Sequence, residues 1–248
     1  MSSPDPQLLD LREHARPDLL AAFVDLYTRT FTDPSEREDP AQWPPRLYGD
    51  LPAPQPRMHL LVAVAGDADS SARDDAQPEI LGGMAFEYYR DSRCGLLTYL
   101  VTDPAHRRRG LARRLIRQAV ALLQRDASES GAELRGVFSE TEDPRQVGAQ
   151  GNAMSPRDRL TALARLGARR IDIPYVQPAL EGGSGRCRHL LLLAFYPDAA
   201  QAAHIEGGVV RDFLHEFYRA LGVEQPHTDL DFRAMETALA TAPALQAL

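Results

Sequence analysis

The stretch Leu100-Val-Thr-Asp-Pro-Ala-His-Arg-Arg-Arg-Gly-Leu-Ala-Arg-Arg-Leu115 contains the turn that decides the predicted fold. We predict that a strand ends at Thr102 and that a helix begins near Gly110, with Asp103-Pro104 as a typical turn between them. The first turn of a helix has unpaired backbone N–H groups and the positive end of the helix dipole. Because these two features together favour a bound anion, we expect this turn to bind phosphate.

Arginines and small residues surround this turn. Residues 107–109 are three arginines before Gly110, and more arginines follow in the predicted helix. A guanidinium suits phosphate oxygens because it donates two parallel, charge-assisted hydrogen bonds. The small residues Gly110 and Ala112 leave room for a pyrophosphate near the backbone. A solvated basic helix start is the alternative, but the order strand, turn, Arg-x-x-Gly-x-Ala and amphipathic helix favours a phosphate site.

The pattern on either side of the turn predicts an α/β domain. From Leu111 the apolar residues change from a period of two to helical spacing, and Gly131 ends that helix. We expect one domain over residues 1–198, with a flexible loop at 66–78, and a helical C-terminal extension over 199–248. The predicted strands are 8–12, 59–64, 80–89, 96–102, 133–139, 170–176 and 189–195, and the other predicted helices are 17–31, 40–51 and 158–166.

The C-terminal extension contains an apolar stripe at helical spacing. Its spacings of three and four residues place the stripe on one face of a helix. We expect this face to pack on the domain or on a second subunit, so a homodimer is one outcome; a lid over the site is the alternative. The stripe consists of Val210, Phe213, Leu214, Phe217 and Leu221.

Composition and charge exclude several classes of protein. The chain has 248 residues, of which 44% are hydrophobic and 25% charged, as in an ordinary globular protein. Its formal net charge of −7 argues against nucleic-acid binding, which needs a basic face, and mildly favours a cationic substrate. No apolar run approaches the ~20 residues of a membrane span. The two cysteines lack CxxC spacing and no signal peptide is visible, so we expect a cytoplasmic protein without metal or membrane.

The turn resembles the acetyl-CoA signature of the GCN5-related N-acetyltransferase (GNAT) superfamily, Gln/Arg-x-x-Gly-x-Gly/Ala. Arg107, Gly110 and Ala112 fill that pattern, and a Val-x-x-Pro common in the family precedes them. The resemblance covers residues 8–197 by pattern but only 100–115 by motif. It implies a mixed, centrally splayed β-sheet flanked by helices, with acetyl-CoA as the co-substrate.

The resemblance also implies how acetyl-CoA would be held. Backbone groups of Leu100 and Thr102 would pair with the pantetheine arm like an added strand. Backbone N–H groups of residues 107–112 would hold the pyrophosphate, and the strands at 96–102 and 133–139 would splay apart to admit the thioester. The residues expected to bind acetyl-CoA are Leu100, Val101, Thr102, Arg107, Arg108, Arg109, Gly110, Leu111, Ala112 and Arg113.

The catalytic residues are less clear, because this sequence departs from the family. Many members carry a general-acid tyrosine four residues before a glycine in the helix after the fifth strand, where this chain has Leu163 before Gly167. Glu140 and Glu142 are candidate bases, which strand alternation would place on one side and burial would make more basic. Tyr175, on the predicted sixth strand, is a third candidate. A solvated acidic loop and an ordinary half-buried tyrosine are the alternatives.

The acceptor is expected between residues 28–51 and the loop 177–188. Acidic and aromatic side chains there suit an ammonium ligand, although a solvated loop around a packed tryptophan explains them equally well. We predict an acetyl-CoA-dependent N-acetyltransferase acting on a primary amine, of a small molecule because the long loop 140–156 would narrow the cleft. A peptide or protein N-acetyltransferase and a non-catalytic CoA-binding regulatory module are the alternatives. The side chains in question are Glu36, Glu38, Asp39, Trp43 and Tyr48.

Overall fold

The computed structural model describes residues 5–32, 37–66, 79–148, 154–180, 185–195, 205–240 and 245–248. In these ranges eight strands form one sheet, in the order β1-β2-β3-β4-β5-β7-β6-β8. Neighbouring strands are antiparallel except β4 and β5, which are parallel, so the sheet is mixed. The strands are β1 (Gln7–Asp10), β2 (Arg57–Val64), β3 (Ile80–Tyr89), β4 (Cys94–Thr102), β5 (Gly136–Glu142), β6 (Ala168–Ile171), β7 (Leu190–Phe195) and β8 (Leu245–Gln246). The helices are α1 (Pro17–Thr30), η2 (Pro40–Gln42), α2 (Trp43–Tyr48), η3 (Pro104–His106), α4 (Leu111–Glu129), α5 (Pro156–Arg165), α6 (Gly207–Ala220), η4 (Pro226–Thr228) and α7 (Leu230–Leu239).

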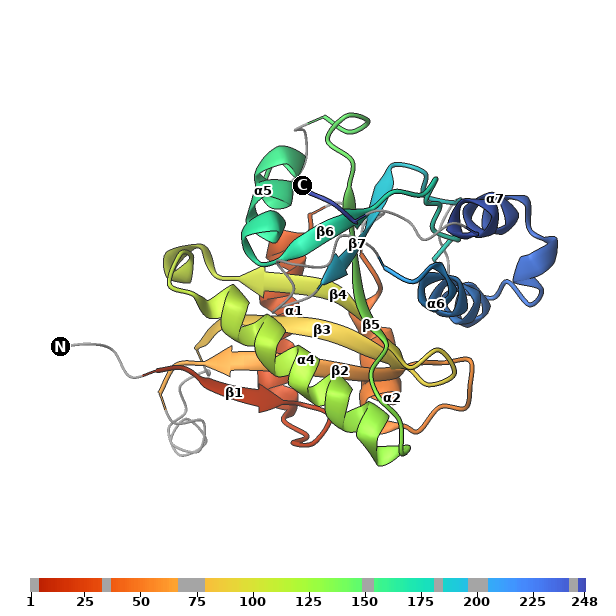
Figure 1. The fold of residues 1–248 in the computed structure, drawn as a ribbon. Helices are drawn as coiled ribbons and strands as arrows, with labels where there is room; N and C mark the ends of the chain where they lie inside the picture. Colours follow the sequence, from red (N-terminus) through yellow and green to blue (C-terminus); the bar gives the residue numbers. More distant parts are fainter. Residues whose placement is uncertain are drawn as a thin grey trace.

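The central feature of the sheet is the separation of β4 from β5. The two strands pair only where residues 94–97 face residues 136–139. Beyond this point β5 pairs with β7 as far as Glu142, whereas in the described ranges residues 98–102 have a strand partner only in β3. The second half of β4 therefore has an unpaired backbone edge where the two strands diverge (Figure 1). This confirms the predicted central splay.

A β-bulge in β4 decides which of its side chains face each layer. Ala85 of β3 faces Tyr99, whereas the next residue, Phe86, faces Leu97, so Thr98 is the extra residue. The hydroxyl of Thr98 donates to the carbonyl of Ala85 at 2.8 Å. Because one extra residue reverses the alternation, even-numbered residues before the bulge pack with α6 and odd-numbered residues after it pack with α1.

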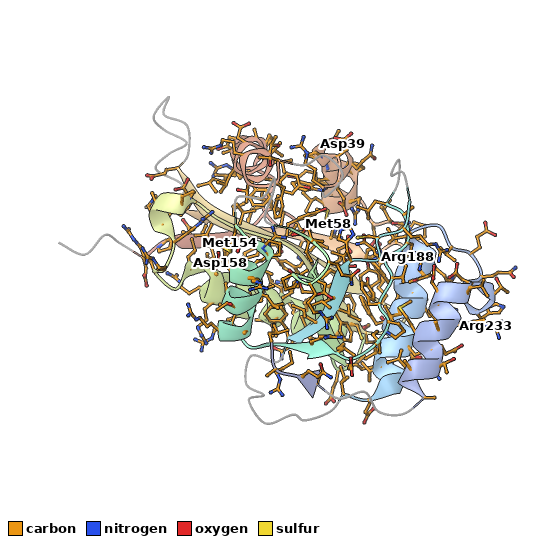
Figure 2. All side chains as sticks on the ribbon, turned by 90° about the horizontal axis from the view of Figure 1, so that it is seen from above. Asp39, Met58, Met154, Asp158, Arg188 and Arg233 are labelled. Carbon is orange, nitrogen blue, oxygen red and sulfur yellow. The ribbon has the colours of Figure 1, made fainter. Side chains whose placement is uncertain are left out.

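Helices cover both faces of the sheet. α4 packs an apolar stripe from Leu111 to Ala127 across one face, and α1 buries Leu19, Phe23 and Leu26 against the other. Figure 1 shows α4 in front of the sheet and α1 and α2 behind it, and Figure 2 shows the layers from above. No helix within the described ranges is both long and apolar enough to cross a membrane.

The C-terminal helices pack on this same sheet. α6 buries Val210, Phe213 and Phe217 in one cluster with Phe138 of β5 and Leu192 of β7. α7 packs against α6, and the chain then returns to the sheet as β8, the partner of β6. The apolar stripe of the extension is thus buried within the chain itself. β8 has no counterpart in the prediction, and the expected domain boundary near 198 lies outside the described residues.

The fifth strand differs from its prediction at both ends. The strand expected at 133–139 exists, but its bounds are wrong, because β5 begins at Gly136 and continues to Glu142. Pairing with the apolar strand β7 extends β5, because Glu140 and Glu142 pair with residues of β7. The two glutamates therefore lie within the sheet, where they are more buried than in the acidic loop considered as the alternative.

Prolines explain two further differences from the prediction. β6 ends at Ile171 and does not reach 176, because Pro174 has no N–H with which to continue a ladder. The predicted helix 40–51 is also wrong in its bounds: the chain forms η2 and then the short α2. Pro44 lies in the first turn of α2, where a missing N–H leaves no hydrogen bond unmade.

A buried ionic network ties β1 and β2 to the end of α4. His59 Nδ1 lies 2.7 Å from Asp10 Oδ2, and its Nε2 lies 2.8 Å from Asp126 Oδ2. Arg57 pairs with the other oxygen of Asp126 at 2.8 Å. Burial by itself would lower the pKa of His59, but the hydrogen bonds and charges of the two carboxylates outweigh it and raise the pKa. The folded state therefore holds a proton on His59 that the unfolded chain has released.

We predict that the free energy of unfolding declines as the pH rises above the unfolded histidine pKa of about 6.5. Because the pKa of His59 is higher in the folded state, its protonation stabilises the folded state fully at pH values below the unfolded pKa. This stabilisation is lost as the pH rises through the folded pKa. His59→Gln should lower the free energy of unfolding by about 1–3 kcal/mol at low pH and flatten the decline. Urea unfolding across this pH range measures both. An equally steep decline in the variant would contradict the assignment to His59.

Candidate active site

The turn before α4 has the backbone shape of an anion site. Arg108 has a φ of +62° and Gly110 a φ of +81°, with Arg109 between them. Such alternation directs successive N–H groups into one concave surface. Gly110 is the N-cap of α4 and provides no side-chain cap, so the first N–H groups of the helix remain available to a ligand. A Cβ added at Gly110 would meet no atom within 4 Å, so the space over the turn is open.

The predicted phosphate-binding arginines divide into two pairs. Arg107 donates from Nε to the last carbonyl of β4 at 3.4 Å, and Arg113 donates to the last carbonyl of α5 at 2.7 Å. These two side chains therefore hold the turn to its neighbours. Arg108 and Arg109 are exposed, and within the described ranges no carboxylate pairs with either. Their guanidinium groups are thus available to an anion.

The unpaired edge of β4 leads directly to this turn. Leu100 and Thr102 are half-buried, whereas Val101 is buried toward α1. Leu111 is buried beneath the turn with the apolar stripe of α4, and Ala112 is half-buried beside it. The residues predicted to bind acetyl-CoA therefore form a continuous path from a strand edge to a helix N-terminus.

Glu140 lies on β5, past the point where β4 separates from it. Its Oε1 accepts a hydrogen bond from the Tyr175 hydroxyl, and both its oxygens accept from Gln177 Nε2 at 3.0 Å. Burial raises the pKa of Glu140 to about 7, and the hydrogen bonds from Tyr175 and Gln177 oppose part of this rise. A carboxyl with this pKa can accept and release a proton near neutral pH, as a general base must.

Two further carboxylates approach Glu140, and their charges add to the rise of its pKa. These are Glu38, before η2, and Glu87, on β3. Arg46 of α2 binds both: its Nη1 lies 2.9 Å from Glu38 Oε2, and its Nη2 contacts Glu87 Oε1. Tyr89 donates to the other oxygen of Glu87 at 2.7 Å. Arg46 carries one positive charge against the two carboxylates that it binds, so a net negative charge remains near Glu140 when both are ionised.

Aromatic rings line the region beside Glu38. The ring of Tyr99 lies edge-on to Tyr27, at a centroid distance of 4.9 Å, and to Phe31, at 5.3 Å. Trp43 donates from Nε1 to Glu38 Oε2 at 3.2 Å, and the Tyr99 hydroxyl accepts the Glu38 backbone N–H at 3.1 Å. Aromatic faces next to carboxylates form a surface that attracts an ammonium group.

Glu142, the second candidate base, has different partners from Glu140. Glu142 is 3% exposed and forms an ion pair with Arg159 of α5 at 3.1 Å. Leu163, also on α5, packs into the apolar cluster between α4 and the sheet. At the position from which many family members supply a tyrosine acid, this chain therefore has a partly buried apolar side chain that packs against the core.

Of the predicted acceptor residues that the structure describes, Glu38 and Trp43 lie at the site, whereas Asp39 and Tyr48 do not. Asp39 accepts a hydrogen bond from the N–H of Ala41 and so caps η2. Tyr48 is 44% exposed at the end of α2. Glu36 lies outside the described residues.

Sequence reasoning did not single out Arg46, Glu87 or Gln177. Glu87 is the only charged residue within β3, and a charge inside an apolar strand is itself a signal of a functional or paired group. Gln177 falls inside the predicted acceptor loop, whereas nothing local distinguishes Arg46 from the other arginines. In the described part of the chain no three His, Cys, Asp or Glu side chains gather as a potential metal site.

Comparison with known proteins places this site in a family. The family model described as "Acetyltransferase (GNAT) family" matches residues 20–147, from α1 through β5. A comparison with curated proteins found no match.

Solved structures with a similar fold include several acetyltransferases. A protein of Bacteroides thetaiotaomicron assigned to the GNAT family is 15% identical, with a TM-score of 0.54 over 86% of this chain and 98% of that chain. Tetrahymena GCN5 is 11% identical, with a TM-score of 0.45 over 77% and 97%. The ribosomal-protein-S18-alanine N-acetyltransferase of Escherichia coli is 12% identical, with a TM-score of 0.43 over 77% and 92%. At 15% identity, the similarity to the Bacteroides thetaiotaomicron protein shows a shared fold alone.

The family match spans more than half of the 248 residues and includes the splayed strands, the arginine-rich turn and Glu140. The mixed sheet and its order of elements agree with that match. This chain therefore belongs to the GNAT family of acetyltransferases.

Proposed function

We propose that this protein is an acetyl-CoA-dependent N-acetyltransferase whose acceptor is a small molecule carrying a primary ammonium group. One observation carries the proposal: Glu140, with a pKa of about 7, lies where β5 leaves β4 and is oriented by Tyr175 and Gln177. Family membership supports acyl transfer, and the acidic surroundings of Glu140 support an amine as the acceptor.

The residues present fit acetyl-CoA, which supplies an acetyl group activated as a thioester. The unpaired edge of residues 98–102 offers backbone groups to an extended chain of amides, as in strand addition. The N–H groups of residues 107–112 suit a pyrophosphate at the start of α4. Arg108 and Arg109 add charge-assisted contacts to its oxygens.

Glu140 acts as the general base in this proposal. Glu140 first accepts a proton from the bound ammonium, which frees the lone pair of the nitrogen, and passes this proton to solvent. The neutral amine nitrogen then forms a bond to the acetyl carbon, the second proton lost by nitrogen passes to Glu140, and the carbon–sulfur bond breaks. Tyr175 and Gln177 hold the carboxylate in position by donating hydrogen bonds to it. The N–H groups on the edge of β4 are the donors available to the carbonyl oxygen as its negative charge develops.

The thiolate leaves without a tyrosine acid. Leu163 stands at the sequence position of that acid and packs, partly buried, against the core. An ordinary thiol has a pKa of about 8.5, so its thiolate is stable enough to leave near neutral pH. The proton held by Glu140 then passes to the thiolate or to solvent, and the carboxylate is ready for another cycle.

The charge and depth of the acceptor side support a small cation. Glu87 is 6% exposed and Glu38 23%, so both carboxylates are recessed. Arg46 offsets part of their charge, and the remaining negative charge attracts an ammonium. A compact amine reaches recessed carboxylates more readily than a side chain on the surface of a folded protein does.

Incubation with acetyl-CoA and a panel of acceptors tests this proposal through the release of free thiol. We expect release with small ammonium compounds and none with neutral alcohols of similar size. If thiol is released with peptides and not with small amines, the acceptor is a peptide and the small-molecule proposal is wrong. Tight CoA binding with no thiol release from any amine would leave only a CoA-binding module.

Glu140→Gln should lower kcat by about 10²–10⁴-fold, because an amide cannot accept the proton. The KM for acetyl-CoA should stay unchanged, since Glu140 lies outside the path from β4 to α4. Glu142→Gln makes the same substitution two residues along β5 and should have a much smaller effect on kcat. Steady-state kinetics of both variants decide between the two glutamates. A larger loss of kcat in Glu142→Gln would reverse the assignment.

Gly110→Glu should abolish CoA binding, because it strains a φ of +81° and places a carboxylate at a helix N-terminus. Gly131→Glu is the matched control, with a φ of +70° at the other end of α4 and open space around an added Cβ. It imposes a similar strain of about 1–2 kcal/mol and should leave CoA affinity unchanged in calorimetric titration. Unchanged affinity in Gly110→Glu would show that the phosphate site lies elsewhere.

A further inference from the structure

The segment that orients Glu140 is itself held by the C-terminal helices. Tyr175 and Gln177, which both donate to Glu140, are the neighbours of Val176 in the chain. The hydroxyl of Tyr218 in α6 donates to the carbonyl of Val176 at 2.6 Å. Tyr218 is fully buried, with its ring packed edge-on against α7. A single hydrogen bond from α6 thus fixes the backbone between the two donors.

A second contact holds the chain opposite Gln177. Gln177 and Cys187 exchange both backbone hydrogen bonds, at 2.9 and 3.0 Å. Arg186 and Arg188, on either side of Cys187, pair with Asp231 at the start of α7 at 2.7 and 2.8 Å. Figure 2 shows Arg188 beside α6 and α7. The helices therefore hold both chain segments that meet at Gln177.

We propose that Tyr218 is a positioning residue for acetyl transfer, which holds Tyr175 and Gln177 where they hydrogen-bond Glu140. This inference rests on the proposed role of Glu140 as the base. The family model ends at residue 147, before Val176 and the C-terminal helices. The extension is thus a part of the chain, outside the matched segment, that shapes the catalytic carboxyl.

The other groups that face Glu140 do not depend on Tyr218. Glu87 on β3 and Glu38 before η2 act on Glu140 through their charges, and Arg46 of α2 pairs with both. Loss of the Tyr218 hydroxyl should therefore weaken only the two hydrogen bonds that lower the pKa of Glu140, and that pKa should rise. Tyr89, which donates to Glu87, packs on Phe213 and Phe217 of α6, and a substitution that keeps the ring of Tyr218 leaves this packing in place.

Tyr218→Phe tests the proposal, because it keeps the buried ring and removes only the hydroxyl. We expect Glu140 to titrate near pH 7 in the wild type and higher by about half a unit or more in the variant. Carbon-13 NMR of the glutamate carboxyls measures this in the protein alone, with the signal assigned by its loss in Glu140→Gln. In kinetics the variant should lose kcat about tenfold and keep its KM for acetyl-CoA.

Two further variants make the test specific. Arg186→Gln removes the ion pairs of the half-buried Arg186 with Asp229 and Asp231 and should shift the titration in the same direction. Tyr88→Phe removes a buried hydroxyl from the opposite face of β3, beside α4, and should leave the titration unchanged. An unchanged titration in Tyr218→Phe, or an equal shift in Tyr88→Phe, overturns the positioning role. A shifted titration in a protein that acetylates no amine would support the positioning and refute the proposed function.

Discussion

The site depends on the end of the pairing between β4 and β5. Backbone N–H and C=O groups need hydrogen-bond partners, and residues 98–102 of β4 lack a strand on one side within the described part of the chain. Glu140 lies on β5 one residue beyond the last pair between β4 and β5. The bulge at Thr98 turns the side chains of this unpaired half toward α1. The end of the pairing between β4 and β5 thus leaves an unpaired strand edge, to which we propose that acetyl-CoA binds, next to the carboxyl that we propose as the base.

Two buried carboxylate networks in this chain have different charge balances. Around His59, two aspartates share one imidazolium and an arginine, so the charges offset one another and the network stabilises the fold. Near Glu140, Arg46 pairs with both Glu38 and Glu87, so its one positive charge offsets only part of the negative charge of the glutamates. Burial of like charges makes a carboxylate more basic, and such groups are concentrated at functional sites. Tyr175 and Gln177 donate hydrogen bonds to this carboxyl, and Tyr218 of α6 donates to the carbonyl of Val176 between them.

The sequence predicted helices and strands well where their formation depends on residues close together in the chain. The strand, turn and helix around Gly110 depend on a positive φ and on an apolar stripe, and both are visible in the sequence. The extent of β5 depends on pairing with β7, about 50 residues later, so the loop expected at Glu140 is a strand. The partners of Glu140 come from distant parts of the chain, and Arg46 and Gln177 carry no local mark of that role. β8 was missed for the same reason, because it pairs with β6, about 75 residues earlier in the chain.

The dependence of kcat/KM on pH tests the central claim most directly, with an acceptor that remains an ammonium throughout. If Glu140 is the base, the wild-type value should rise about tenfold per pH unit on the acid side and level off near pH 7. The residual activity of Glu140→Gln should show no break at that pH. A break near 7 that persists in Glu140→Gln, or a wild-type profile without one, would contradict the assignment of Glu140 as the base.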